Sequence, residues 1–462
     1  MSLAGRRSFH IFPLFAVAIA LLYYGRFLDN FFTFDDFKYL ENMYRTRADV
    51  LIGYGSLRLL SNASWWPLFA LSGFDPLGYN LFALILFTAN AILLYVLLLR
   101  LIRDRQTAFL AAAFFVAGSV GADAIFWKAT NSSLISLFFY LGSLILYVES
   151  RRDGSTGKFV TAFLLFAAAM FSKEEAASLP LVAAMVDILF LDGWRDRRGL
   201  AKRFTILSTV VFLYLAGNAL VFNYLLNGQA EPQKLFRLRP LYSFLGGGTA
   251  FYLHPDGFIR VNSLPVYLTV LLIPVSFLIV RDRRLLLFGY LWVFLAFLPQ
   301  SLTGLGQFEP RVIVNSVSRY LYITSIGSSI VFASILMRGR GILPKRWWYL
   351  LCAAVLVIFV FFHYQRVKVR GELWMKYGND MKEFVAEMKR VVPALSGKCH
   401  VHVVNGPGGR AFIQQALRAF YANPEIYWID DPEQTGVPAG EPVFVVLYQV
   451  RPEDPLQVFQ VR

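Results

Sequence analysis

Eleven long apolar runs dominate the sequence and limit the folds that the chain can adopt. A helix needs about 20 apolar residues to cross the hydrocarbon core of a bilayer. The runs lie near residues 9–27, 80–101, 107–125, 131–149, 158–172, 176–191, 204–225, 264–281, 285–303, 318–337 and 347–364. Hydrophobic residues make up 57% of the chain and charged residues 16%, which is unlike a soluble globular domain. The sequence therefore predicts an all-α polytopic membrane protein with about eleven transmembrane helices. The fifth and sixth runs are short and joined at "FSKEEA", so a re-entrant pair is an alternative there.

Clusters of Lys and Arg predict the topology, because they lie before the first run and then in every second loop between the runs. They are Arg6/Arg7, Arg100/Arg103/Arg105, Arg151/Arg152/Lys158, Arg195/Arg197/Arg198/Lys202/Arg203, Arg281/Arg283/Arg284 and Arg338/Arg340/Lys345/Arg346. Basic loops stay on the cytoplasmic side, so the N-terminus is expected inside the cell and the C-terminal region outside. The net charge of +15 is thus explained by topology and does not indicate nucleic-acid binding. We expect a multi-pass protein of the inner (plasma) membrane.

The predicted topology divides the chain into two domains. Residues 1–365 form the transmembrane domain, with outer loops at 28–79, 226–263 and 304–317. Hydropathy falls after residue 365, where "KCHVHVVNGPGG" and "EPVFVVLYQV" have the pattern of strands and "RAFIQQALRAFY" that of an amphipathic helix. Residues 366–462 are therefore expected to form an extracytoplasmic α/β module. "NGPGGR" is expected to be a strand-to-helix turn, because it lacks the Lys-Ser/Thr of a phosphate loop.

Two adjacent carboxylates, Asp35 and Asp36, follow the first run in "FTFDDFKYL". Neighbouring residues point about 100° apart on a helix and to opposite faces of a strand, so these two do not share one surface. We expect separate tasks: one faces a cavity as a general base, and the other caps a helix that begins near Phe37. The alternative is that both only cap and solvate the helix start. Asp35 is slightly favoured as the base.

Further ionisable residues interrupt the apolar pattern at the same predicted face. The set, with the tyrosines beside it, is Lys173, Glu174, Glu175, Arg319, Tyr320 and Tyr322. Charges at such depth are costly unless they are paired or hydrated, so they indicate a polar cavity. The competing explanations are a loop ion pair between Lys173 and Glu174 and an interfacial position for Arg319. Asp187 lies near the basic cluster that begins at Arg195, where structural pairing competes with function.

Five segments together resemble a known family. "FTFDDFKYLENMY", "SLRLLSNASWWPLFALSGFDPLGYNLFALILFTANAILLY", "AIFWKATNSSLIS", "FSKEEAASLPLVAAMVDILF" and "SVSRYLYITSIGSSIVF" occur in the order and with the spacing of C-type membrane glycosyltransferases. The chain is most similar to bacterial relatives of protein O-mannosyltransferases and of the transmembrane mannosyltransferases that carry tetratricopeptide repeats. The resemblance covers roughly residues 10 to 380. No tetratricopeptide array follows.

The resemblance implies an activity and roles for specific residues. A monosaccharide would pass from a polyprenyl-phosphate donor to an acceptor hydroxyl of a glycan, lipid or protein at the extracytoplasmic face, with inversion. The family's catalytic base maps onto Asp35 or Asp36. Its phosphate-binding residues map onto Lys173 and Arg319, with Arg58 as a third, and Glu174, Glu175, Tyr320 and Tyr322 would support them.

The chain also departs from the family pattern. Relatives often have Arg-Pro where this chain has Arg58-Leu59, and His where it has Asn80. A further His and Asn are replaced by Phe87 and Ala83, which puts the acceptor and any metal role of that region in doubt. Asp35 with Asp36 could hold Mg²⁺ or Mn²⁺, but no third oxygen ligand is evident, so no cofactor is required.

Two other functions remain open from the sequence. A polyprenyl-linked glycan ligase or polymerase would place key basic residues in a large outer loop, and the 226–263 loop contains Lys234, Arg237, Arg239, His254 and Arg260. A transporter or lipid flippase would place charges at mid-depth and break corresponding spans in two halves. The predicted charges gather at one face instead.

Overall fold

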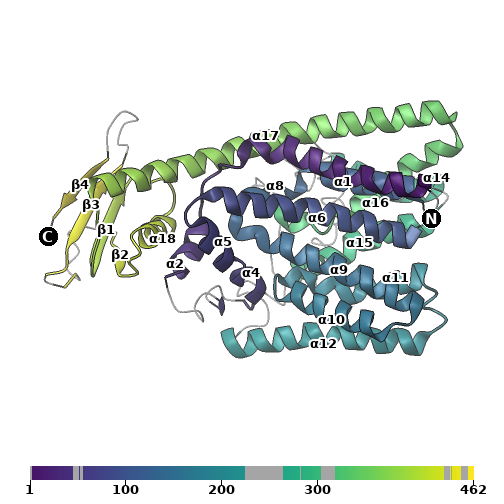
Figure 1. The fold of residues 1–462 in the computed structure, drawn as a ribbon, viewed down its shortest axis with the longest axis horizontal. Helices are drawn as coiled ribbons and strands as arrows, with labels where there is room; N and C mark the ends of the chain where they lie inside the picture. Colours follow the sequence, from purple (N-terminus) through teal and green to yellow (C-terminus); the bar gives the residue numbers. More distant parts are fainter. Residues whose placement is uncertain are drawn as a thin grey trace.

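The computed structural model describes residues 3–44, 51–52, 56–102, 104–223, 264–280, 282–302, 318–430, 437–438, 440–448 and 456–461. A helical bundle and a small sheet lie toward opposite ends of this elongated molecule (Figure 1). Each of the eleven predicted runs contains a helix. These are α1 (Leu3–Tyr24), α6 (Pro76–Ile102), α7 (Arg105–Ala117), α9 (Asn131–Asp153), α10 (Thr156–Met170), α11 (Leu179–Phe190), α12 (Arg197–Phe222), α14 (Leu264–Ile279), α15 (Arg283–Leu302), α16 (Ser325–Met337) and α17 (Lys345–Val391). The predicted loops 226–263 and 304–317 lie outside the described residues.

The helices differ in their capacity to cross a bilayer. Within the described ranges, four helical segments are long and apolar enough to cross a bilayer. Three of them are α6, α12 and α17, and the fourth is Lys128–Asp153, which contains α9. A fifth arises if α7 and the segment Ser119–Phe126, which meet at a bend of 41°, count as one span. In contrast, α10 and α11 have 15 and 12 residues and are shorter than the hydrocarbon core. The chain is an integral membrane protein, and the number of eleven spans stays a prediction.

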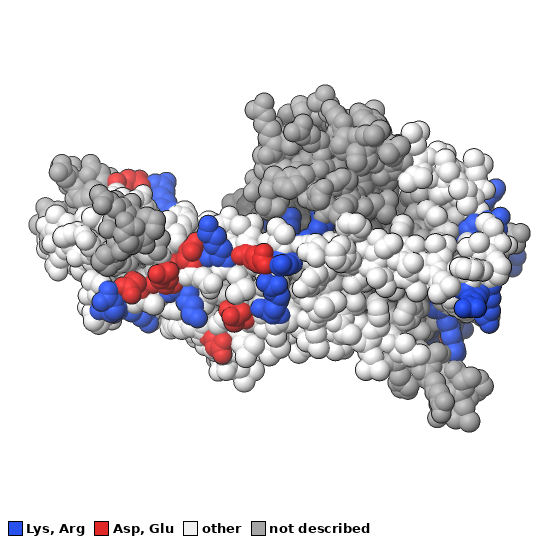
Figure 2. Space-filling model, turned by 90° about the horizontal axis from the view of Figure 1, so that it is seen from above, with Lys and Arg blue, Asp and Glu red and all other residues white. Residues whose placement is uncertain are grey.

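Charge is distributed unevenly along the long axis. Figure 2 shows Lys and Arg at the end of the bundle away from the sheet, mixed charges over the other half, and between them a band with few charged side chains. Exposed apolar side chains of α1 and α17, among them Leu14, Leu22, Val357 and Phe361, are typical of contact with lipid. We call the two ends the basic end and the module end.

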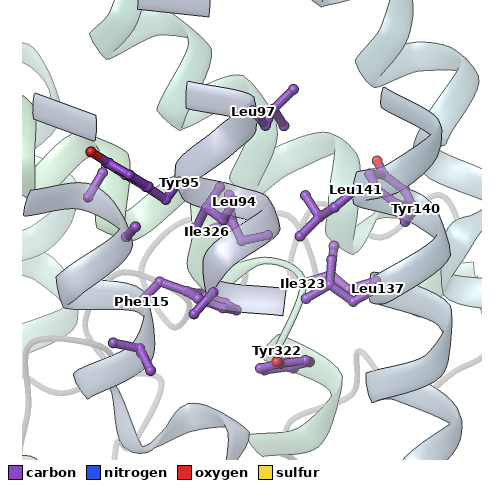
Figure 3. Close-up of a cluster of buried hydrophobic side chains, with 14 of the residues drawn as sticks. Leu94, Tyr95, Leu97, Phe115, Leu137, Tyr140, Leu141, Tyr322, Ile323 and Ile326 are labelled. Atoms are coloured by element: carbon purple, nitrogen blue, oxygen red, sulfur yellow. The ribbon is translucent and has the colours of Figure 1, made fainter. Parts of the chain in front are cut away.

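The bundle is held together by a continuous apolar core. In Figure 3, Leu94 and Leu97 of α6 lie near Leu137 and Leu141 of α9, with Ile326 of α16 in the same cluster. Polar side chains also form hydrogen bonds in this core: the Asn90 side-chain amide donates to the Leu134 carbonyl oxygen at 3.0 Å and to the Tyr322 hydroxyl at 3.3 Å.

Helix α17 joins the two ends of the molecule. Its 47 residues correspond to about 70 Å, roughly twice the thickness of the hydrocarbon core. It begins at the basic end and continues without interruption into the module (Figure 1). The predicted span 347–364 and the predicted domain boundary at 365 therefore lie within one helix. A side chain at Gly371 would meet the ring of Phe27, so α17 closely approaches the 3-10 turn η1 (Gly25–Phe27) that follows α1.

The module contains a four-stranded sheet in the order β2-β1-β3-β4. Strands β1 (Cys399–Val404), β2 (Ile426–Trp428) and β3 (Val443–Leu447) are parallel, and β4 (Gln457–Gln460) is antiparallel to β3. Val401 of β1 is in register with Trp428 and Phe444. Helix α18 (Arg410–Phe420) connects β1 to β2. The two expected strands, the helix and the strand-to-helix turn are present, whereas β2 and β4 were not expected from the sequence.

A second apolar core joins the module to the first outer loop. Helix α2 (Asp36–Asn42) contributes Phe37 and Leu40, which belong to the same buried cluster as Leu417 of α18 and Met388 of α17. One ion pair, Arg418 to Glu41 at 3.4 Å, crosses the same contact. The module therefore packs on the loop that carries Asp35 and Asp36.

Candidate active site

Short helices and turns meet at the module end of the bundle and bring together residues that are far apart in the sequence. They are the loop before α2, the residues before α4 (Leu59–Ala63), and three 3-10 turns: η3 (Lys128–Thr130), η4 (Glu174–Ser178) and η6 (Ser318–Leu321). All of the charged site residues predicted from the sequence lie in or beside these segments. Contacts between these short segments, such as that of Arg58 with Glu174, bring together side chains that lie far apart in the sequence.

Asp35 and Asp36 have different surroundings. The carboxylate of Asp36 is fully buried and accepts the backbone N–H of Thr33 at 2.9 Å and of Ala129 at 2.6 Å. Asp35 is half-buried at the N-terminus of α2, and its carboxylate has no hydrogen-bond partner in the described part of the chain. Asp36 is thus fixed by the backbone, whereas the described residues leave the Asp35 carboxylate free to accept a hydrogen bond.

The charge state of these two acids depends on burial and on nearby cations. Burial raises the pKa of Asp35, and the positive charges of Arg319, Lys38 and Arg58 oppose this effect. Burial also raises the pKa of Asp36, against the opposing influence of Lys128 and of its two backbone hydrogen bonds. A raised pKa makes a carboxylate a stronger base, which suits a residue that accepts a proton from a hydroxyl.

Lys128 braces the loop that carries the two acids. Its buried ammonium group donates to the backbone carbonyl oxygens of Asn30 at 2.8 Å and Phe31 at 2.9 Å. The backbone of Ala129 donates in return to Asp36. These reciprocal contacts connect residues almost a hundred positions apart, so no local sequence pattern indicates them.

Phe34, directly before Asp35, has a left-handed backbone with φ of 47°. This conformation is unusual for a bulky residue and costs about 1–3 kcal/mol, so the surrounding structure must hold it. The Phe34 ring contacts those of Trp127, Trp374, Tyr377 and Phe412, with centroid distances of 6.1, 5.8, 5.4 and 5.3 Å. Aromatic packing from three parts of the chain therefore fixes the backbone at Asp35.

Two of the three predicted phosphate-binding cations already have carboxylate partners. The Arg58 guanidinium binds Glu174 through two hydrogen bonds, of 2.9 and 2.5 Å. Lys173 is 3% exposed; its ammonium group lies 3.1 Å from Glu175 Oε2 and also contacts the Ser133 hydroxyl. Burial disfavours the charged form of Glu174, but Arg58 and Lys173 outweigh this effect and lower its pKa. The competing explanation from the sequence, a loop ion pair between Lys173 and Glu174, is thus replaced by two separate ion pairs, Arg58 with Glu174 and Lys173 with Glu175.

Arg319 is different, because no ion pair to a carboxylate is found for it among the described residues. Its guanidinium lies over the rings of Trp127 at 4.4 Å and Tyr320 at 4.7 Å and donates to the Tyr320 hydroxyl at 2.9 Å. Its Nη1 atom is buried and has no hydrogen-bond partner in the described ranges. An arginine in this state can bind an anion, and its planar group suits the two oxygens of a phosphate.

The other expected residues occupy supporting positions. Tyr320 connects Arg319 to Lys173, whose ammonium lies 5.2 Å from its ring centroid. Tyr322 is buried in the bundle core, where its hydroxyl binds Asn90. Asn80, which stands where relatives often have His, donates to the carbonyl oxygens of Leu28 and Asn30 and so has a structural role.

Asp187 belongs to the basic end. It is fully buried and binds Arg151 at 2.9 Å, Arg203 at 3.0 Å and the Tyr147 hydroxyl at 2.6 Å. This network connects α9, α11 and α12 at the end opposite the candidate site. The structural explanation for Asp187 therefore holds.

The acid pair does not form a ready site for Mg²⁺ or Mn²⁺. Both oxygens of Asp36 are occupied by backbone N–H groups, which repel a cation in the same position. Across the described ranges, no group of three or more His, Cys, Asp or Glu residues could hold a metal ion.

Comparisons with known proteins identify the fold. No protein-family model matches the chain. Protein O-mannosyl-transferase Tmtc1 of Drosophila melanogaster is 26% identical over 178 residues, which cover 34% of this chain and 21% of that protein. The chain thus aligns with about a fifth of the length of that curated relative.

Solved structures match over almost the whole chain. ArnT from Cupriavidus metallidurans has a TM-score of 0.54 in the apo state at 12% identity, and 0.52 bound to undecaprenyl phosphate at 11% identity; each covers 94% of this chain and 92% of that one. The Archaeoglobus fulgidus oligosaccharyltransferase in complex with Zn and sulfate has a TM-score of 0.51 at 12% identity and covers 92% and 62%. The chain has the fold of C-type membrane glycosyltransferases, which confirms the resemblance expected from its sequence.

Proposed function

We propose that this C-type fold acts as a membrane glycosyltransferase. It transfers a monosaccharide from a polyprenyl-phosphate donor to an acceptor hydroxyl at the module end, which faces the extracytoplasmic side. One observation carries the proposal: among the described residues, Asp35 is a carboxylate without a hydrogen-bond partner, and it lies within electrostatic range of Arg319, for which the same ranges contain no carboxylate partner. The similarity in fold to ArnT, whose structure is known with undecaprenyl phosphate, supports the choice of donor.

The proposed reaction needs a base on the acceptor side. Asp35 accepts the proton of the acceptor hydroxyl while the hydroxyl oxygen forms a bond to the anomeric carbon. The bond from that carbon to the phosphate oxygen breaks, and polyprenyl phosphate leaves with the bonding electrons. The carboxylate also stabilises the positive charge that develops on the sugar ring. Attack from the face opposite the phosphate inverts the anomeric configuration.

The leaving phosphate needs a fixed positive charge. Arg319 is held by two aromatic rings and one hydroxyl, so its guanidinium is oriented before the donor binds. Donors that are preorganised in this way stabilise developing negative charge without reorganisation during the reaction. Lys173 and Arg58 also contribute positive electrostatic potential, which their carboxylate partners Glu175 and Glu174 reduce. They hold η4 and the start of α4 in place, which is a supporting role.

The first test of this function is release of polyprenyl phosphate. The purified protein in nanodiscs is given a panel of polyprenyl-phosphate monosaccharides with a crude membrane extract as acceptor. We expect turnover of one donor class, and a loss of about 10²–10³ in kcat for Arg319→Met. Arg26→Met is the matched control, because Arg26 lies at the module end but is exposed and bound to Glu372. Absence of turnover for every donor, or equal rates for the two variants, contradicts the proposal.

A further inference from the structure

Phe412 connects the C-terminal module to the candidate active site. It lies in the first turn of α18, and its ring is 5.3 Å from that of Phe34 in an edge-to-face arrangement. Phe34 is the residue that precedes Asp35 and that has the left-handed backbone. The module thus touches the segment that determines where the Asp35 carboxylate lies.

The contact continues to the phosphate side of the site. Phe34 packs against Trp127 with centroids 6.1 Å apart, and the guanidinium of Arg319 lies 4.4 Å from the Trp127 ring centroid. The row Phe412, Phe34, Trp127 and Arg319 therefore connects one module side chain with both proposed functional groups. Rings packed edge to face transmit a displacement, because each fills the space that limits its neighbour.

A second set of contacts keeps α18 in position on α2. Phe420, at the other end of α18, stacks on Phe74 at 4.3 Å and on Phe31 at 5.9 Å. Arg418 pairs with Glu41 near the end of α2. Because the C-terminal end of α18 is fixed against the first outer loop, the helix cannot readily carry Phe412 away from Phe34.

We propose that Phe412 is a positioning residue for the active site, so that the module is part of the catalytic unit. The ring of Phe412 holds Phe34 in its left-handed conformation and thereby keeps the Asp35 carboxylate in a fixed position relative to the Arg319 guanidinium. This inference rests on the proposed function for its kinetic consequence. Its structural consequence, order in the segment around Asp35, does not.

The test compares Phe412→Ala and Phe412→Tyr in nanodiscs with Phe459→Ala as a matched control, and adds Phe34→Ala alone and combined with Phe412→Ala. Phe459 is in β4 and is 50% exposed. We expect Phe412→Ala to lower kcat for polyprenyl-phosphate release about tenfold or more, since small misplacements of reacting groups are costly. Phe412→Tyr restores most of the rate because it keeps the ring. Phe34→Ala combined with Phe412→Ala is no slower than Phe34→Ala alone if the two rings act as one unit.

Hydrogen exchange supplies the readout that does not need turnover. Backbone amides of residues 33–42 are expected to exchange faster in Phe412→Ala than in wild type or Phe459→Ala. Equal exchange in the two alanine variants overturns the inference, and so does faster exchange with an unchanged kcat. If the wild type turns over no donor, the proposed glycosyl transfer fails, and the exchange comparison alone decides whether Phe412 orders this segment.

Discussion

At the scale of single residues, Asp35 and Asp36 have the same side chain and are adjacent in sequence, yet their surroundings in the structure differ. Asp36 is surrounded by backbone donors and a buried lysine, which fix its position. Asp35 has cations at longer range and no hydrogen-bond donor within the described ranges. A base must be free to bind the acceptor hydroxyl, so availability distinguishes the two acids more clearly than charge does.

The raised pKa of Asp35 predicts the pH dependence of the reaction. A base acts only when ionised, so kcat/KM falls as pH decreases through the raised pKa, above the ordinary range of an aspartate. Lys38 favours the ionised form, so Lys38→Met moves this acid limb to higher pH. Lys382→Met, a change on exposed α17, leaves the limb in place. A pH–rate profile for each variant checks this. An acid limb that stays in place or moves to lower pH in Lys38→Met contradicts the proposal that Asp35 is the base.

Lys128 is predicted to matter for stability through its contacts with the loop. Lys128→Met leaves the buried Asp36 without its nearby cation and two carbonyl oxygens without their donor. Removal of one member of a buried charged network costs about 3–5 kcal/mol. The thermal midpoint of Lys128→Met in detergent should therefore fall clearly. In the double variant Lys128→Met/Asp36→Asn, the midpoint should fall by less than the sum of the decreases in the two single variants, because the two groups interact. Strict additivity of the two changes would show that the groups do not interact.

At the scale of elements, glycines determine how closely helices approach one another. Helices α15 and α16 cross at Gly289 and Gly327, and a Cβ atom at Gly327 would lie 2.7 Å from the Val293 backbone nitrogen and closer still to the Gly289 carbonyl oxygen. Because these neighbours are backbone atoms, they cannot rotate away. Small residues at a crossing allow close packing in a membrane, where helix association depends on contact.

Gly327→Ala is therefore expected to lower stability by about 1–3 kcal/mol, the usual cost of overpacking. Gly25→Ala is the control, because no atom lies within 4 Å of an added Cβ atom there. Thermal unfolding of both variants in detergent measures the difference. Equal midpoints would mean that the two helices can separate at no cost.

Hydropathy predicted the positions of helices well and their lengths poorly. Each apolar run contains a helix because lipid contact requires apolar side chains. In contrast, α17 continues to Val391, far beyond the predicted end of its span at residue 364. The amino-acid composition of α17 becomes more polar where the predicted span ends, but its helical backbone hydrogen bonds continue past that point. Hydropathy therefore marks the end of the apolar segment and not the end of the helix. The three-residue strand β2 is too short to show a pattern of its own.

At the scale of the whole molecule, the two ends differ in charge and in chemistry. The basic end contains the buried Asp187 network, and the module end contains the proposed site. The module packs on the first outer loop through a shared apolar core, so the site lies between the bundle and the module. Under the proposed function, we expect an acceptor to bind near the module and a lipid-linked donor near the bundle.

The proposed orientation predicts which end is accessible from outside the cell. Gln457→Cys, on exposed β4, should react with a membrane-impermeant maleimide on intact cells, whereas Arg198→Cys at the basic end should react only after permeabilisation. The native Cys352 and Cys399 are buried and give little background. The reverse labelling pattern would contradict the proposed topology.

The sequence points to the charged residues of the candidate site but not to the residues that they contact. Asp35, Arg58, Lys173 and Arg319 stand out because charges are rare near apolar runs. Lys128 and Trp127 do not, because the residues that they contact in the site are more than 90 positions away and only the fold brings them together. Likewise, the pairing of Glu174 with Arg58 depends on a contact across 116 positions.

The most direct test of the account compares Asp35→Asn with Asp36→Asn. Polyprenyl-phosphate release and thermal midpoint are measured for both, with Asp29→Asn as an exposed control in the same loop. The account predicts that Asp35→Asn lowers kcat by about 10²–10⁴ at an unchanged midpoint. Asp36→Asn lowers the midpoint, because an amide cannot accept both backbone N–H groups, and its folded fraction keeps most of the activity. Full activity in Asp35→Asn, or complete loss in well-folded Asp36→Asn, would contradict Asp35 as the base.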